Sequence, residues 1–250
     1  MSISLSVGGT RALVLDIEGT TTPVEFVYRV LFPFARAHVA EYLEQEWRSD
    51  ACRAALGLLR AEHAGDTARG DAPPVWIDAP LAAPHASAAV YVAWLMDRDR
   101  KSSGLKALQG GIWRRGYQSG ELRGQVFPDV PPALARWHEQ RLTVSIYSSG
   151  SVLAQQLLFQ TTAAGDLTRF LTGYFDLAVG PKASPDSYRC IVQTLGAPAG
   201  HVLFISDTAA EIEAARVAGL RTLLCVRPPA SLPAGECTHP VIRTFSDLVD

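Results

Sequence analysis

Hydrophobic residues occur in two different patterns along the chain. Short continuous apolar runs predict buried strands of the kind found in a parallel sheet covered on both faces, at 11–16, 142–147, 175–179, 202–206 and 220–226. Between these runs, apolar residues at helical spacing predict helices over 151–159, 185–195 and 208–218. Strands that alternate with helices indicate an α/β fold with a parallel sheet and right-handed crossovers.

The segment from about Phe26 to Tyr117 departs from this alternation. Its apolar residues recur at helical spacing only, and a Pro- and Asp-rich stretch at 71–84 suits a connection between helices. We therefore expect a helical insert after the first strand. The predicted domains are an α/β core made of residues 1–24 and 122–250, and a helical cap domain over residues 25–121.

Composition restricts the partners. The chain of 250 residues is 48% hydrophobic and 19% charged, with a net charge of −2, so a large core is expected and a concentrated basic face is not. Nucleic acid and anionic membrane surfaces both need such a face, and neither is an expected partner. The longest apolar stretch that resembles a membrane-spanning segment, 86–96, is too short to span a bilayer. We expect a cytoplasmic protein that acts as a monomer.

The cysteines do not indicate a metal site. Cys52, Cys190, Cys225 and Cys237 form no C-x-x-C pair and lie at no zinc-finger spacing from histidines. Buried, reduced thiols are the expected state of all four.

Polar residues stand where the predicted strands end. Asp16, Ser148 and Asp207 each follow an apolar run, and an open parallel sheet binds ligands beyond the carboxyl ends of its strands. We expect these side chains to face one crevice.

Asp16 and Glu18 are two acids one residue apart. Like charges raise each other's pKa, so a divalent cation such as Mg²⁺, which prefers oxygen ligands, is the expected compensation. A strand-end carboxylate can also attack phosphorus, while a second acid protonates the leaving oxygen and later activates water. Gly19 allows a ligand to approach the backbone closely. The alternative is an ordinary turn after a strand.

Three further features gain meaning from their order along the chain. Ser148 and Ser149 precede a helix N-terminus, where backbone N–H groups favour phosphate, although most such sequences only cap helices. Lys182 lies in a loop between a strand and a helix, where a lysine can pair with phosphate but is more often solvated. Asp207 can cap a helix, bind a metal, or do both.

Together, these positions resemble the haloacid dehalogenase-like superfamily over essentially the whole chain. That resemblance implies a Rossmann-like core, with Asp16 as nucleophile, Ser148 and Lys182 as phosphate ligands, and Asp207 as a Mg²⁺ ligand. Longer stretches are similar to the enolase-phosphatase family of methionine salvage: Asp16–Pro23, Phe26-Val27, Leu31–Phe34, Leu108–Gly110 with Trp113, Ile146–Ser151, Leu203–Asp207 and Val226–Pro228.

The family resemblance implies a bifunctional enzyme. Its substrate would be the phosphate ester 2,3-diketo-5-methylthiopentyl-1-phosphate, enolised first and then hydrolysed to an acireductone, 1,2-dihydroxy-3-keto-5-methylthiopentene, and phosphate. Asp16 and Glu18 would be catalytic, Ser148, Ser149 and Lys182 would bind substrate, and Asp16, Glu18 and Asp207 would hold Mg²⁺. Phe26, Leu108 and Trp113 are candidates to contact the methylthio tail, although packing in the core of the cap is the favoured interpretation of each.

Some positions depart from the family pattern. Pro181 stands where a polar residue is usual, and Ala183-Ser184-Pro185 replaces a segment that usually carries an acid. The loop around Lys182 is therefore expected to differ in shape.

Three other functions fit parts of the pattern. A generic sugar- or glycolate-phosphatase of the same superfamily would differ mainly in the cap. A haloacid dehalogenase would use the same Asp nucleophile without Mg²⁺ and would not need Glu18. A catalytically silent phosphate-binding module would not need the complete set of motif residues.

Overall fold

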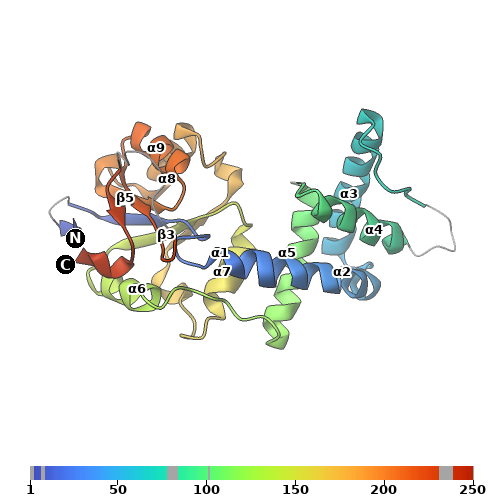
Figure 1. The fold of residues 1–250 in the computed structure, drawn as a ribbon, viewed down its shortest axis with the longest axis horizontal. Helices are drawn as coiled ribbons and strands as arrows, with labels where there is room; N and C mark the ends of the chain where they lie inside the picture. The colour runs from blue at the N-terminus through green and yellow to red at the C-terminus, as the bar shows by residue number, and fades with distance from the viewer. Residues whose placement is uncertain (1–2, 7–8, 78–83, 101, 231–238, 250) are drawn as a thin grey trace. The chain divides into compact units, whose positions relative to one another are not determined.

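The computed structural model describes residues 3–6, 9–77, 84–100, 102–230 and 239–249. The chain forms two compact units (Figure 1). One contains Met1–Val27 together with Arg123–Asp250, and the other contains Tyr28–Leu122.

The first unit is built on a six-stranded parallel sheet with the order β4-β3-β2-β5-β6-β7. Its strands are β2 (Ala12–Leu15), β3 (Thr143–Tyr147), β4 (Gly173–Phe175), β5 (Val202–Ser206), β6 (Arg221–Cys225) and β7 (Val241–Ile242). A separate pair joins β1 (Ile3–Ser4) to β8 (Leu248–Val249). The predicted α/β fold with a parallel sheet is confirmed.

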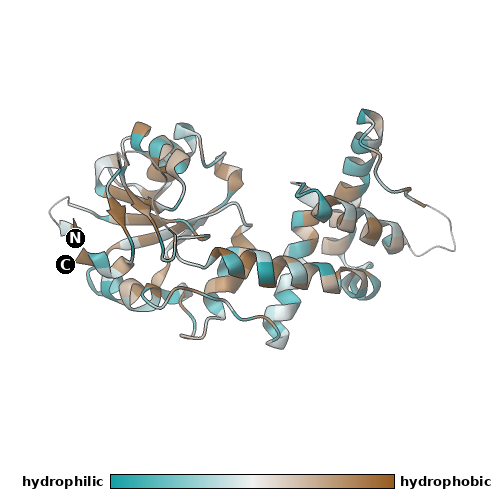
Figure 2. Cartoon of the chain, viewed as in Figure 1, coloured by the Kyte–Doolittle hydropathy of each residue, from teal (hydrophilic) through white to brown (hydrophobic). Residues whose placement is uncertain are grey.

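Strand β2 occupies the centre of the sheet. Leu15 lies opposite Ile146 of β3 on one side and Ile205 of β5 on the other. All four residues of β2 are buried, as expected for a strand covered on both faces, and Figure 2 shows the strands as the most hydrophobic part of this unit. The chain after β2 therefore emerges between two neighbouring strand ends, at a topological switch point of the sheet.

The longer helices of this unit lie between its strands in the sequence: α6 (Val130–Glu139), α7 (Val152–Gln160), α8 (Pro185–Leu195) and α9 (Ala209–Val217). The core on one face contains Tyr147, Tyr188 and Phe204, whose rings meet edge to face. The helices expected at 151–159, 185–195 and 208–218 are present within one or two residues.

Two expectations were wrong in detail. The strand expected at 175–179 ends at Phe175, because the Asp176 side chain accepts a hydrogen bond from Ala178 N and starts a 3₁₀ turn over Leu177–Val179. Cys190 is exposed, since it lies on the solvent-facing side of α8. Cys52 and Cys225 are buried free thiols, as expected, and Cys237 lies outside the described residues.

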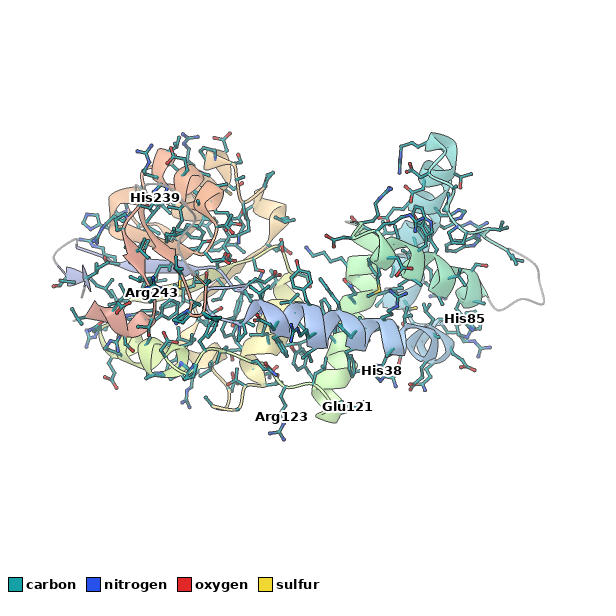
Figure 3. All side chains as sticks on the ribbon, viewed as in Figure 1. His38, His85, Glu121, Arg123, His239 and Arg243 are labelled. Carbon is teal, nitrogen blue, oxygen red and sulfur yellow. The ribbon has the colours of Figure 1, made fainter. Side chains whose placement is uncertain are left out.

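The second unit is helical. It contains part of a π-helical turn (Val27–Leu31) that follows the short helix α1 (Val24–Phe26), and then α2 (Phe32–Glu46), α3 (Asp50–Arg69), α4 (Pro84–Asp97) and α5 (Ser103–Ser119). The carboxylate of Glu62, on α3, accepts hydrogen bonds from Ser103 N and Gly104 N, so one helix caps the N-terminus of another. His38 and Glu121 lie 3.7 Å apart at the other end of α5 (Figure 3).

The residues proposed to contact a substrate tail are all buried. Trp113 donates its indole N–H to the Leu31 carbonyl at 2.9 Å and stacks on Phe32, while Phe26 and Leu108 are each 1% exposed. In the described helices, no segment is both long and apolar enough to cross a membrane.

Gly104 lets α3 and α5 approach closely. A Cβ there would lie 2.6 Å from Leu59 Cγ and 2.7 Å from Leu59 N. We expect Gly104→Ala to lower the free energy of unfolding by about 1–3 kcal/mol, the usual cost of overpacking. Gly57→Ala is the control, because Gly57 is exposed on α3 with nothing within 4 Å, and it should stabilise by roughly 0.5–1 kcal/mol. Denaturant unfolding of both variants checks this, and equal stabilities would contradict the close approach.

Candidate active site

Asp16 follows β2 at the switch point and is only 4% exposed. Its backbone N–H donates to Ile205 O at 3.0 Å, which continues the pairing with β5. One carboxylate oxygen, Oδ1, accepts from Ile17 N at 2.7 Å, and the other, Oδ2, accepts from Ser206 Oγ at 3.0 Å. The carboxylate is therefore fixed in orientation by both neighbouring segments.

Lys182 lies between two carboxylates. Its Nζ is 2.6 Å from Asp16 Oδ1 and 2.7 Å from Glu211 Oε2, and all three side chains are mostly buried. Although burial alone would lower the pKa of Lys182, the charges of Asp16 and Glu211 raise it above its ordinary value. The lysine is therefore a fixed cation beside Asp16, and the reading of it as a solvated loop residue is wrong.

The loop that carries Lys182 is held by α8 and β3. Tyr188 donates its hydroxyl to Lys182 O at 2.7 Å, Ser187 donates to Pro181 O at 2.8 Å, and Tyr147 donates to Gly180 O at 2.9 Å. Three side chains thus fix three successive carbonyl groups, and Pro181 is accommodated without loss of the Lys182 contact to Asp16.

Asp207 packs against the turn that follows Asp16. Gly19 has φ +66°, and a Cβ built on it would lie 2.0 Å from Asp207 Oδ2. Only glycine allows this approach, so the sequence places an acid from the end of β5 directly on the Asp16 turn. Partial burial and the negative charge of Asp16 raise the pKa of Asp207.

Glu18 lies on the same turn as Gly19 and is influenced by the charges of Asp16 and Lys182. Burial, followed by the negative charge of Asp16, raises the pKa of Glu18 above its ordinary value, and Lys182 opposes that rise. A glutamate with a raised pKa is suited to hold and release a proton near neutral pH.

Ser148 and Ser149 follow β3, the strand paired with β2, and so lie at the same edge of the sheet as Asp16. Ser148 is 5% exposed, and its Oγ accepts from Gly150 N at 3.2 Å, whereas Ser149 is exposed. The Gln155 side-chain amide donates to Gly150 O and Phe175 O, and Ser151 caps α7. This is a rigid turn at a helix N-terminus, the arrangement that favours phosphate oxygens.

The donor set suits a Mg²⁺ ion bound by few protein ligands. In the part of the chain that the structure describes, no group of three or more His, Cys, Asp and Glu side chains is arranged to hold a metal. The oxygens expected from the sequence are those of the Asp16 and Asp207 carboxylates, with either the backbone carbonyl or the side chain of Glu18. Mg²⁺ is commonly held by one or two carboxylates with water and substrate phosphate, so these residues fit it.

Sequence reasoning missed Glu211 and Ser206. Ser206 Oγ donates to Asp16 Oδ2 and is also placed 2.9 Å from Glu211 Oε2. Glu211 lies in the first turn of α9, and the N-cap of that helix, Thr208, directly follows Asp207, so the sequence could have placed Glu211 close to the end of β5.

Comparisons with known proteins agree with this geometry. The family model of haloacid dehalogenase-like hydrolases matches residues 10–219. A protein named enolase-phosphatase E1 from Synechococcus elongatus is 50% identical over 239 residues, covering 94% of this chain and 96% of its own. A second protein of that name, from Sorangium cellulosum, is 44% identical and covers 95% and 97%.

Among solved structures, the UTR4 protein of Saccharomyces cerevisiae superposes with a TM-score of 0.75 at 32% identity, covering 95% of this chain and 99% of its own. The agreement therefore includes nearly the full length of each relative. The chain belongs to the haloacid dehalogenase-like hydrolases and, within them, to the enolase-phosphatase E1 family.

Proposed function

We propose that the protein is a Mg²⁺-dependent enolase-phosphatase of methionine salvage that works through an aspartyl-phosphate on Asp16. Its substrate would be 2,3-diketo-5-methylthiopentyl-1-phosphate, and its products the acireductone 1,2-dihydroxy-3-keto-5-methylthiopentene and phosphate. The observation that carries the chemistry is the 2.6 Å contact between Lys182 Nζ and Asp16 Oδ1, which fixes a carboxylate at the switch point of the sheet. The 50% identity to an enolase-phosphatase over 94% of this chain supports the choice of substrate.

In the phosphatase step, an oxygen of Asp16 attacks phosphorus and the bond from phosphorus to the ester oxygen breaks. Glu18 gives its proton to the leaving enol oxygen. Glu18 then takes a proton from water, which attacks the aspartyl-phosphate, releases phosphate and regenerates the Asp16 carboxylate. Lys182, Ser148 and Ser149 hold the phosphate oxygens during both halves.

In the preceding enolase step, a proton passes from the carbon that bears the phosphate ester to a base, for which Glu18 is our candidate, and the neighbouring carbonyl oxygen takes up a proton to become the enol. The same phosphate contacts orient the substrate, so both steps use one site. When bound, Mg²⁺ would neutralise charge on the phosphate and on the developing enolate. Asp16, Asp207 and either the backbone carbonyl or the side chain of Glu18 would hold it.

Gly19 gives a test of that metal site. We expect Gly19→Ala to turn the Asp207 carboxylate away and to weaken Mg²⁺ binding about 10–100-fold, the usual effect of disturbing a metal's surroundings. Gly196→Ala is the matched control, because Gly196 has nearly the same φ, +64°, with nothing within 4 Å. Calorimetric titration with Mg²⁺ measures both. Equal affinities in the two variants would remove Asp207 from the metal site.

Glu18→Gln should slow phosphate release by about 10²–10⁴-fold, because an amide cannot protonate the leaving oxygen. Glu18 is also our candidate proton carrier for enolisation. Solvent-deuterium exchange at the phosphate-bearing carbon separates the two roles. Exchange that survives in Asp16→Asn and vanishes in Glu18→Gln supports both roles, whereas exchange at the wild-type rate in Glu18→Gln places the enolisation base elsewhere.

We propose that the helical segment 25–121 serves as a cap domain that excludes water from the reaction. We also propose that the protein acts as a monomer in the cytoplasm on a small phosphate ester, with neither nucleic acid nor membrane as partner; its reduced thiols Cys52 and Cys225 suit that compartment.

Rapid-quench labelling tests the proposed phosphatase mechanism directly. After a single turnover with substrate carrying labelled phosphate, peptide mapping should find the label on Asp16, and label on another residue would refute the assignment. Turnover of p-nitrophenyl phosphate that depends on Mg²⁺ and stops with EDTA would separate a phosphatase from a dehalogenase or a silent binding module.

A further inference from the structure

Arg227 is a buried arginine that touches the catalytic turn from outside the proposed reaction site. It follows β6 and is 8% exposed. Its Nε and Nη2 both donate to the Thr20 carbonyl, at 2.9 Å and 2.7 Å, and its Nη1 donates to Asp129 Oδ2 at 2.6 Å. One guanidinium thus joins the turn after Asp16 to the start of α6.

The guanidinium is held in place on several sides. It lies over the ring of Phe127 at 4.4 Å and over the ring of Phe245 at 4.6 Å. The flat, forked cation of arginine suits this site, because it can stack on rings while its N–H groups point to two separate acceptors. A lysine offers one point charge and cannot reproduce these contacts.

Asp129 completes the support. Its Oδ2 also accepts from Thr244 Oγ1 at 2.8 Å and from Phe245 N at 2.5 Å. Burial alone would raise the pKa of Asp129, yet the hydrogen bonds from Arg227 and Phe245 hold it below its ordinary value. Asp129 is therefore a charged anchor that connects Arg227 to the C-terminal segment.

The turn that Arg227 contacts is held together by its own backbone hydrogen bonds. Ile17 O accepts hydrogen bonds from the N–H groups of Thr20, Thr21 and Thr22, and Gly19 N donates to Thr22 O. The three threonines are fully buried, but the hydroxyls of Thr20 and Thr22 have no hydrogen-bond partner in the described structure. Arg227 is thus the side chain that fixes the Thr20 peptide, and a shift there would carry Gly19 and Glu18 with it.

We propose that Arg227, anchored by Asp129, is a positioning residue that holds the Asp16–Thr22 turn in its catalytic geometry; this rests on the proposed function of Asp16 and Glu18. Among the described residues, both hydrogen bonds from Arg227 to the turn go to the Thr20 carbonyl, so Arg227 is expected to act through the turn rather than on substrate. Its loss should lower kcat more than it changes KM, because the phosphate ligands Ser148, Ser149 and Lys182 lie on other loops.

The test compares Arg227→Lys with a matched arginine. Arg136 donates to Phe245 O and Leu248 O, so it holds the same C-terminal segment without contacting the Asp16 turn. We expect Arg227→Lys to lower kcat about 10–100-fold, as for a catalytic group displaced by roughly 1 Å, with KM nearly unchanged. Arg136→Lys should keep the wild-type kcat. Hydrogen exchange of peptides covering 17–22 should be faster in Arg227→Lys only.

Wild-type kcat in folded Arg227→Lys, or an equal loss in Arg136→Lys, would overturn the positioning role. If Arg227→Lys does not fold, Asp129→Asn replaces it; a fall in kcat with unchanged KM supports the role, and wild-type kcat overturns it. Asp16→Asn is measured in parallel, because activity in that variant would refute the proposed function itself rather than the role of Arg227.

Discussion

Asp16→Asn should abolish phosphate release while leaving the protein folded. A neutral amide cannot attack phosphorus, and removal of a covalent nucleophile costs on the order of 10⁴-fold or more in rate. The fold should survive because Lys182 keeps its contact with Glu211 at 2.7 Å, so no unpaired buried cation is left behind. Asp16 is also a proposed Mg²⁺ ligand, but enolisation needs no nucleophile. Hydrolysis should therefore slow more than enolisation, and the enol phosphate should accumulate.

The measurement combines phosphate release with the ultraviolet absorbance of the enol, and circular dichroism confirms folding. Asp176→Asn is a suitable control, because Asp176 caps a nearby 3₁₀ turn and contacts none of the site residues in the described structure. Phosphate release at the wild-type rate from Asp16→Asn would exclude Asp16 as the nucleophile.

Lys182→Met should damage both activity and stability. The lysine separates the carboxylates of Asp16 and Glu211, and its removal leaves two mostly buried acids without their shared cation. Breaking a buried ion pair from one side typically costs about 3–5 kcal/mol. Because Lys182 is proposed to bind the phosphate, its loss should also lower kcat/KM, by about 10–100-fold for one charge-assisted hydrogen bond.

A double variant separates these effects. Adding Glu211→Gln to Lys182→Met removes one of the stranded charges, so the double variant should recover part of the lost stability but none of the activity. Chemical denaturation without added Mg²⁺ gives the stabilities. If the changes in free energy of unfolding are simply additive, so that the double variant recovers no stability, Lys182 and Glu211 do not form the coupled pair seen in the structure.

The central strands and the strand-end residues could be predicted because their signals are local. Continuous apolar runs marked β2, β3 and β5. The order of the motifs assigned Lys182 and Asp16 to one site, although 166 residues separate them. Strand β4 was placed too late, since the capping side chain of Asp176 outweighs the apolar residues after it.

Long-range polar contacts could not be predicted in the same way. Arg227 lies 207 residues from Thr20 and 98 from Asp129, and nothing in the neighbouring sequence indicates either partner. Glu211 could have been found from its place in the first helical turn after the end of β5, whereas Ser206 looks like any small residue at the end of a buried strand. Only the tertiary structure shows that Arg227 reaches Thr20 and that Ser206 binds the Asp16 carboxylate.

Incubation of the purified protein with 2,3-diketo-5-methylthiopentyl-1-phosphate tests the central claim most directly. Ultraviolet absorbance follows the enol product while released phosphate is measured in the same sample, with Mg²⁺ and with EDTA. We predict that the enol absorbance rises, that phosphate is released in step with loss of substrate, and that EDTA stops phosphate release. An unchanged diketo phosphate, in a preparation that hydrolyses sugar phosphates or phosphoglycolate with Mg²⁺, would contradict the account and favour a generic phosphatase of the same superfamily.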